Sequence, residues 1–243
     1  MANQKYTVAE KFRYFISILN VDNQVEISRR YKDITRQINS KYWYIKSDSR
    51  NAYYIGSYGR GTAIKGIANI NMLVILPERV FQLFNSHPGN GQRSLIRDVR
   101  ECVGEIYENA HINPEGHLLI DFPDITFEVV PSFISPKKSY MYPEPAAGGS
   151  WKVFNPIREM EVIEEFNYKY NGKIKHLARM MRAWKLTHNV PISGMLLDTL
   201  VLNFMEEWEG QESTFSYYGH MIRDFLEYLA GLRKDQLHWY AKG

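Results

Sequence analysis

The sequence predicts an α+β protein in which a mixed half of strands and helices is followed by an all-helical half. Three observations indicate this class. Helical periodicity covers the first forty residues, strand-like apolar runs dominate residues 46–135, and helical periodicity returns after a proline-rich segment and continues to near the end. The 243 residues are enough for one large domain or for two lobes.

The first expected element is an N-terminal helical brace over residues 1–45. Its apolar side chains recur at helical spacing: Val8, Phe12, Phe15, Ile16 and Leu19, then Ile27, Tyr31, Ile34 and Ile38. A polar break at 20–23 supplies possible N-caps and leaves open whether the brace is one kinked helix or two.

Residues 46–135 are expected to hold the sheet. The strand-like runs are 52–55, 69–76, 118–122 and 125–130, and a helical stripe covers 94–107. The last two runs flank Pro123-Asp124, a turn dipeptide, and so predict a hairpin. The run at 69–76 is apolar beyond its first residues, as expected for a strand buried inside a sheet.

Residues 136–156 are expected to form a loop-like linker. Five of the ten prolines lie there or just before it, together with Gly148-Gly149. A helical C-terminal lobe over 157–243 follows, in which Pro156 suits the first position of a helix closed by Gly172. Further helices are expected at about 173–187, 193–207 and 217–232. Two lobes create a cleft, and ligands usually bind in clefts.

The composition excludes several classes of protein. The formal net charge of +3 is too small for a strongly polybasic nucleic-acid binder. The single cysteine, Cys102, excludes an internal disulfide and a cysteine-based zinc site, and it suits a reducing cytoplasm. The N-terminus lacks an apolar signal, and no run of about 18 apolar residues occurs, so we expect a cytoplasmic protein without a membrane span.

The first candidate motif is the turn after the strand at 52–55. Gly56 permits a tight turn, and Ser57 offers a hydroxyl and an N–H group to an anion. A helix that begins here would add a favourable dipole for phosphate. Because most Gly-Ser turns are only turns, the motif needs support from elsewhere in the chain.

Two asparagines supply that support. Asn69 and Asn71 stand at i and i+2 of a strand, so their side chains leave the same face, and the chain is expected to bring them beside Gly56-Ser57. With Asp at both positions, the pair would suit two metal ions that clamp a phosphoryl transfer. Glu128, on the face opposite Phe127 and Val129, is a third candidate, although a lone Glu in a strand usually faces solvent.

Four blocks, in this order between about residues 50 and 205, carry a family resemblance. The pair GSYGRGT and NINMLVIL resembles the G-S and D-x-D signature of polymerase-β-like nucleotidyltransferases. FEVVPSF resembles the third-carboxylate strand of the oligoadenylate synthetase and cGAS-like branch. WKVFNP and RMMRAWK…ISGMLLDTL resemble the linker and first C-lobe helices of bacterial cGAS/DncV-like nucleotidyltransferases. The sequence is therefore similar to CD-NTases, which make cyclic oligonucleotide signals in bacterial anti-phage systems.

The resemblance implies a polymerase-β-like core and a helical lobe around a cleft. It implies an enzyme that joins NTPs into a cyclic di- or trinucleotide second messenger of CBASS type, which activates an effector protein. It gives catalytic and metal-binding roles to positions 69, 71 and 128, with two Mg²⁺ or Mn²⁺ ions. It gives nucleotide binding to Gly56, Ser57, Arg60, Thr62, Arg182, Lys185 and Ser193. Ser193 is also a candidate N-cap, and a basic stripe such as that of Arg182 is usually a solvated face.

The sequence departs from the family at the D-x-D motif. Asn69 and Asn71 keep the shape of Asp but lose the charge that holds a hard cation, so this form is expected to be inactive. The favoured interpretation is an engineered inactive variant, because isosteric replacement preserves everything else. The alternatives are a natural pseudo-enzyme that binds nucleotide without turnover, and a chance resemblance, which the intact Glu128 disfavours.

Other candidate sites are weaker. The seven histidines show no metal-ligand spacing, so no zinc site is predicted, and no Cys/His insert supports activation by nucleic acid. Five aromatic residues can stack on a base: Tyr58, Phe133, Tyr140, Tyr142 and Trp151. A linear-product or RNA-tailing nucleotidyltransferase remains an alternative function, although the charge of +3 offers little for an RNA groove.

Overall fold

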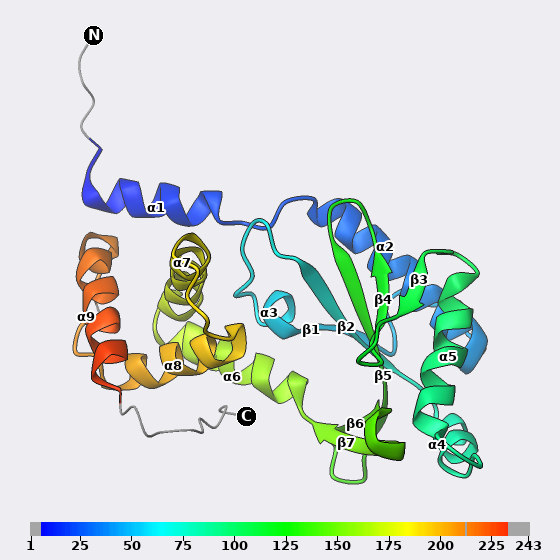
Figure 1. Ribbon diagram of the computed structural model, residues 1–243. Helices are drawn as coiled ribbons and strands as arrows, with labels where there is room; N and C mark the ends of the chain where they lie inside the picture. Colours follow the sequence, from blue (N-terminus) through cyan, green and yellow to red (C-terminus); the bar gives the residue numbers. More distant parts are fainter. Residues whose placement is uncertain (1–5, 212, 233–243) are drawn as a thin grey trace. The chain divides into compact units, whose positions relative to one another are not determined.

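The computed structural model describes residues 6–211 and 213–232, and the chain divides into two compact units (Figure 1). The sheet unit comprises residues 23–59 and 67–156, and the helical unit comprises residues 1–22, 60–66 and 157–243. The expected brace over 1–45 is thus divided between the units at residue 22. The polar break at 20–23 separates two helices, and Asn23 has a left-handed backbone before the second one.

The sheet unit is built on a seven-stranded mixed sheet. Five strands follow one another in the order β1 (Ala52–Ile55), β2 (Asn69–Ile75), β5 (Thr126–Ile134), β4 (Leu118–Asp121) and β3 (Ala110–Ile112). The pair β2 and β5 is parallel, whereas the remaining pairs are antiparallel. The apolar run in β2 is explained by its central place, since it has a neighbour on each side.

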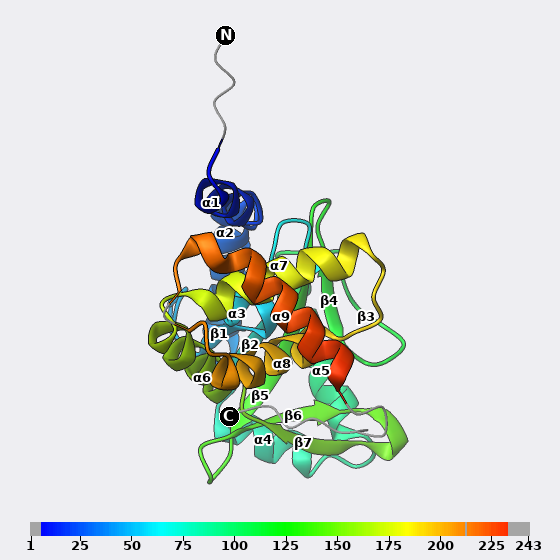
Figure 2. The same cartoon turned by 90° about the vertical axis from the view of Figure 1, so that its left-hand side faces the viewer.

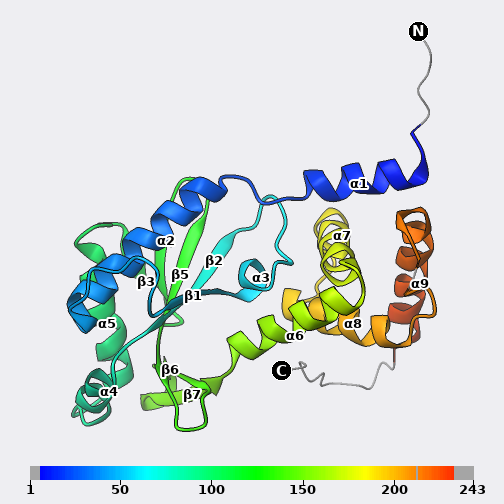
Figure 3. The same cartoon turned by 180° about the vertical axis from the view of Figure 1, so that it is seen from behind.

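Amphipathic helices cover this sheet. They are α2 (Gln24–Ile38), α4 (Glu78–Asn85) and α5 (Gly91–Gly104), with a π-helical turn at Asn39–Trp43 and the single turn α3 (Gly56–Gly59). Figure 3 shows α2 crossing the back of the sheet. The buried faces of α2 and α5 carry the periodic side chains, such as Ile34 and Val99. Helix α4 and strand β3 are short elements that the periodicity did not predict.

The expected linker at 136–156 is wrong, because this segment forms a hairpin. Strand β6 (Tyr140–Glu144) pairs with β5 and with β7 (Ser150–Phe154). The register between β5 and β6 includes only Tyr140 and Met141, so Pro143 lies beyond it and has a strand on one side only, where proline is tolerated. Gly148 and Gly149, both with positive φ, form the turn. The glycines therefore mark the turn of the hairpin, and Pro143 marks a part of β6 that has a neighbouring strand on one side only.

The helical unit follows the predicted pattern closely. Its helices are α1 (Val8–Ile18), α6 (Pro156–Lys169), α7 (Lys173–Thr187), α8 (Gly194–Glu207) and α9 (Tyr218–Gly231), with a 3₁₀ turn at Phe215–Tyr217. Figure 2 looks onto this unit with α9 in front. The apolar stripes of the helices share one core with Ile64 from the 60–66 segment. Within the described ranges, no helix combines the length and apolar character that a bilayer span requires.

A buried histidine should make the stability of the helical unit depend on pH. The Nδ1 atom of His176 lies 2.9 Å from the Tyr218 hydroxyl, and burial, with the nearby Arg179 and Lys173 cations, lowers the pKa of His176 from 6.5 to about 4. The unfolded chain therefore takes up a proton first. We expect the stabilisation of the folded unit by neutral His176 to be complete above pH 6.5 and to be lost as the pH falls toward 4.

The measurement is the free energy of unfolding in urea between pH 4 and pH 7.5, for the unmodified chain and for His176→Gln. The variant should lack the histidine's share of the acid destabilisation, which is roughly 1–2 kcal/mol after allowance for partial exposure. Equal pH dependence in the two proteins would contradict this assignment.

Candidate active site

Three polar side chains meet on the two central strands of the sheet unit. Asn71 of β2 and Glu128 of β5 are register partners in the parallel pair. The Asn69 amide donates to Asn71 Oδ1 over 3.0 Å, and the Asn71 amide donates to Glu128 Oε2 over 2.9 Å. The structure thus brings together the three side chains that the sequence proposed as the catalytic set.

The turn after β1 approaches the same side chains. Gly56 has a φ of +63°, and a Cβ atom at this position would lie 3.3 Å from the Cγ atom of Asn71. Glycine therefore permits both the left-handed backbone and the close approach. Ile55, the preceding residue, is the register partner of Asn71. The expected proximity of Gly56 and Asn71 is confirmed, and Ser57 follows in the single turn α3.

His117 also belongs to this set, although its spacing from the other histidines did not indicate a site. Its Nδ1 atom lies 2.7 Å from Glu128 Oε1, just before β4 begins. The predicted hairpin carried the signal, because its register places Leu119 opposite Glu128 and makes His117 a diagonal neighbour on the same face. Glu128 is thus held from two sides, by Asn71 and by His117.

The side chains present do not suit two divalent cations. Magnesium binds through charged oxygen ligands, and Glu128 is the single carboxylate among the three. Its Oε2 atom already accepts a hydrogen bond from Asn71, and its Oε1 atom contacts His117. Across residues 6–211 and 213–232, no group of three or more His, Cys, Asp or Glu side chains is arranged to hold a metal. We therefore derive no metal-dependent step for this form.

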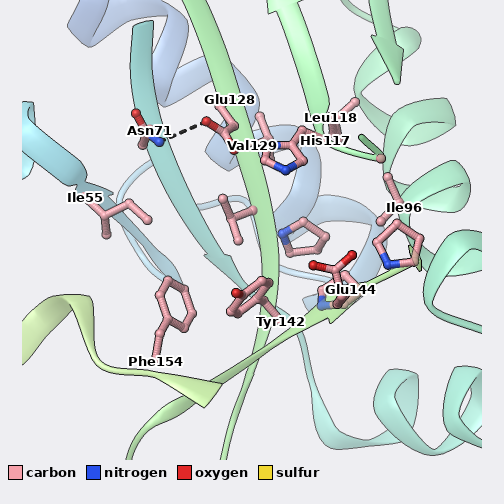
Figure 4. A pocket seen from close by; sticks show the side chains of 15 residues that line it. Ile55, Asn71, Ile96, His117, Leu118, Glu128, Val129, Tyr142, Glu144 and Phe154 are labelled. Atoms are coloured by element: carbon pink, nitrogen blue, oxygen red, sulfur yellow. Dashed lines mark hydrogen bonds and ion pairs between the residues drawn. The ribbon is translucent and has the colours of Figure 1, made fainter. Parts of the chain in front are cut away.

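A cavity of about 280 Å³ opens beside Asn71 and Glu128. In Figure 4 these two residues lie at one end, and Phe154, Tyr142 and Glu144 lie at the other. The rings of Tyr142 and Phe154 meet edge to face, with centroids 4.8 Å apart. Tyr142 lines the cavity, and stacking of its ring on a base stays a prediction. Phe133 cannot stack on a base, because it is buried against Phe81 and Trp151, which corrects that candidate.

The helical unit holds the proposed nucleotide ligands Arg60, Thr62 and Arg182 around one buried carboxylate. Asp198 of α8 is 2% exposed, and its Oδ2 atom accepts hydrogen bonds from Arg60 Nε at 2.9 Å, Thr62 Oγ1 at 2.8 Å and Arg182 Nη2 at 2.8 Å. Arg60 also contacts Glu159, whose pKa is raised by burial. In this structure the guanidinium groups of Arg60 and Arg182 therefore bind other groups of the protein itself.

Two further proposed ligands, Ser193 and Lys185, lie in the same unit. Ser193 caps α8, because its Oγ atom accepts from the Leu196 N–H group over 3.1 Å, so the capping role is confirmed. Lys185, near the end of α7, has no carboxylate partner among the residues that the structure describes. Of the three proposed cationic ligands, Arg60, Arg182 and Lys185, it is the one best suited to an external anion. Nucleotide binding by these residues stays a prediction.

Comparison with known proteins assigns the chain to a family. The sequence model of the Second Messenger Oligonucleotide or Dinucleotide Synthetase (SMODS) domain matches residues 6–167, which is more than half of the chain. The chain belongs to the SMODS family. Gly56, both asparagines and Glu128 lie within the matched range. The resemblance to CD-NTases that the four sequence blocks carried is thereby confirmed.

Curated relatives of this SMODS chain are cyclic nucleotide synthases. A probable cyclic nucleotide synthase from Bacillus cereus is 30% identical over 206 residues, which cover 72% of this chain and 60% of the relative. A cyclic AMP-AMP-AMP synthase from an Acinetobacter species is 24% identical over 188 residues, which cover 75% of this chain and 54% of the relative. The SMODS chain thus spans between half and two thirds of these relatives.

Solved structures confirm the fold of the SMODS chain. A CdnE c-di-GMP synthase from Capnocytophaga granulosa has a TM-score of 0.68 at 15% identity, covering 95% of this chain and 75% of that one. The c-UMP-AMP synthase CdnE from Rhodothermus marinus has a TM-score of 0.62 at 15% identity, covering 95% and 88%. The α+β class and the polymerase-β-like core that the sequence predicted are confirmed.

Proposed function

We propose that this SMODS chain is a nucleotidyltransferase that joins NTPs into a cyclic di- or trinucleotide. The product would be a second messenger in cytoplasmic anti-phage signalling of CBASS type, and it would activate a separate effector protein. The observation that carries the proposal is the meeting of positions 69, 71 and 128 on parallel central strands beside the Gly56 turn. The cyclic nucleotide synthases among the relatives support it.

The proposed reaction is a series of nucleotidyl transfers, two for a cyclic dinucleotide and three for a cyclic trinucleotide. A ribose 2′- or 3′-hydroxyl of one NTP attacks the α-phosphorus of another, a new O–P bond forms, and pyrophosphate leaves. A further round closes the ring or first adds a third nucleotide. We assign to Glu128 the role of accepting the hydroxyl proton, and its contacts with His117 and Asn71, which fix its orientation, support this role. Positioning of the two nucleotides supplies much of the acceleration.

In its present form the site should bind NTP without turnover. A parent with Asp at positions 69 and 71 would present three carboxylates, which suit two Mg²⁺ or Mn²⁺ ions. The asparagines preserve the shape of the site and remove the charges. The proposal therefore separates binding, which this form keeps, from metal-dependent chemistry, which it lacks.

The test restores both carboxylates. Asn69→Asp/Asn71→Asp protein is incubated with the four NTPs and Mg²⁺ or Mn²⁺, treated with phosphatase, and analysed by mass spectrometry. We expect a phosphatase-resistant product of cyclic mass, because a ring has no terminal phosphate. The matched control adds Glu128→Gln, which should reduce product formation at least a hundredfold, since mutation of the groups that do the chemistry typically costs that much.

The other outcomes favour the alternatives. A linear product with phosphatase-sensitive ends would indicate chain synthesis or RNA tailing. Absence of NTP consumption with either metal would contradict the proposed enzyme and leave a nucleotide-binding pseudo-enzyme. One observation favours that second candidate: Asn69, Asn71, Glu128 and His117 form a continuous chain of contacts that needs no metal.

A further inference from the structure

The cavity beside Asn71 and Glu128 has a second carboxylate at its far end. Tyr142 and Glu144 stand at i and i+2 of β6, so both side chains leave the same face of the strand, and both line the cavity (Figure 4). The hairpin that replaces the expected linker supplies this wall. The cavity thus joins the candidate catalytic residues to an aromatic ring and a carboxylate.

Glu144 has acceptor capacity to spare. Its Oε1 atom accepts a hydrogen bond from the Ala146 N–H group over 3.1 Å. In the part of the chain that the structure describes, no Lys, Arg or His side chain forms an ion pair with it. An ionised carboxylate offers about four lone-pair sites, so Oε2 and part of Oε1 remain for a ligand.

The lining of the cavity suits an aromatic ring system. Tyr142 and Phe154 provide aromatic walls, and Pro131 and Pro145 provide apolar ones. The volume of about 280 Å³ lies below the roughly 300–1,000 Å³ of pockets that enclose a whole drug-sized ligand. The cavity therefore suits a nucleobase with its ribose directed toward Glu128, and it leaves the phosphates outside.

A carboxylate distinguishes the four bases by their donors. Guanine presents two adjacent donors on one edge, N1–H and the N2 amine, which match the two oxygens of a carboxylate. The adenine amine lies between the acceptors N1 and N7, and the cytosine amine lies beside the acceptor N3, so each offers a single donor group next to a ring nitrogen that a carboxylate repels. The N3–H group of uracil lies between two carbonyl acceptors. A carboxylate at the end of a base pocket therefore selects guanine.

We propose that this cavity is a guanine-binding subsite in which Glu144 accepts hydrogen bonds from N1–H and the N2 amine. The inference rests on the proposed function, since it assumes that a nucleotide occupies the site beside Glu128. It names guanosine nucleotides as one substrate class. Tyr142 stacks on the base, and Glu144 specifies it.

The test measures equilibrium binding and needs no catalysis. The dissociation constants of GTP, ATP, CTP and UTP are measured by calorimetry, with Mg²⁺, for the unmodified chain. We expect GTP to bind at least about tenfold more tightly than the other three nucleotides, because one charge-assisted hydrogen bond contributes about this factor to the affinity. Glu144→Gln should weaken GTP binding by about tenfold and change the other three little, because the Gln amide opposes the guanine donors.

Glu115→Gln is the matched control. It makes the same exchange in the neighbouring cavity, whose wall also includes Arg93 and Arg97, and it should leave all four constants unchanged. The melting temperature of each variant shows whether it is folded. If Glu144→Gln does not fold, the base preference of the unmodified chain decides the question.

The outcomes separate this inference from the proposed function. Tight GTP binding that depends on Glu144 supports both. Equal binding of the four NTPs, unchanged by Glu144→Gln, overturns the guanine subsite and leaves the nucleotidyltransferase proposal standing. Absence of binding by any NTP overturns the proposed function and the subsite with it.

Discussion

Replacing Asp198 by Asn should lower the free energy of unfolding by about 3–5 kcal/mol, the usual cost of removing one partner from a buried ion pair. Asp198 is 2% exposed, and the side chains of Arg60 and Arg182 are 7% and 14% exposed. A neutral amide at this position would leave two guanidinium groups buried without their shared carboxylate. The unfolded chain keeps both groups in water, so the folded state bears the whole cost.

Equilibrium unfolding in urea measures this difference. Glu161→Gln is the control in the same unit, because its pair with Arg158 is exposed on both sides and should contribute little to stability. A change below about 1 kcal/mol for Asp198→Asn, equal to that of the control, would show that the network does not hold the buried charges. Unchanged slopes of the denaturation curves would confirm that both variants unfold in the same way.

The Asn69→Asp/Asn71→Asp variant should be less stable than the unmodified chain without metal, by on the order of 2–4 kcal/mol. The exchange removes two hydrogen bonds, from Asn69 to Asn71 and from Asn71 to Glu128. It also places a carboxylate about 3 Å from Glu128, where the amide now donates. Like charges at this distance repel, and one of them is driven to bind a proton.

Divalent cations should reverse this loss in the variant alone. A ligand that binds only the folded state stabilises it by about 2.7 kcal/mol at a hundred times its dissociation constant. Melting temperatures in EDTA and in a Mg²⁺ series measure the effect independently of any product. The unmodified chain should show no shift. An equal Mg²⁺ shift in both proteins would place the metal elsewhere and contradict the role of positions 69 and 71.

The candidate site was predicted in part because its main signals are local. A strand period of two places Asn69 and Asn71 on one face, and the Gly56 turn precedes them by a short stretch of chain. Glu128 could be assigned because it lies on a second apolar strand and inside a block that resembles the family. His117 was missed because the sequence predicted the hairpin but no register was drawn from it, and the register makes His117 a diagonal neighbour of Glu128.

The basic side chains show where sequence reasoning reaches its limit. Arg60, Arg182 and Asp198 are separated along the chain by up to 138 residues, and no periodicity relates them. A basic helix face exposed to solvent and a buried network of ion pairs can contain the same residue types at the same spacing. Only packing decides which guanidinium faces solvent, and here Arg182 bonds to Asp198 and to the Gly194 carbonyl.

The sequence by itself determined the α+β order, the helices of the C-terminal half, and two asparagines, Asn69 and Asn71, where the family resemblance leads one to expect D-x-D. These follow from side-chain periodicity and from residue identity, which act over a few positions of the chain. The tertiary structure alone decided that residues 140–154 form a hairpin, that Glu144 lies in the cavity beside Glu128, and that Asp198 gathers two arginines. Such contacts depend on strand register and long-range packing, because residues far apart in the chain become neighbours only when the sheet and the helices have formed.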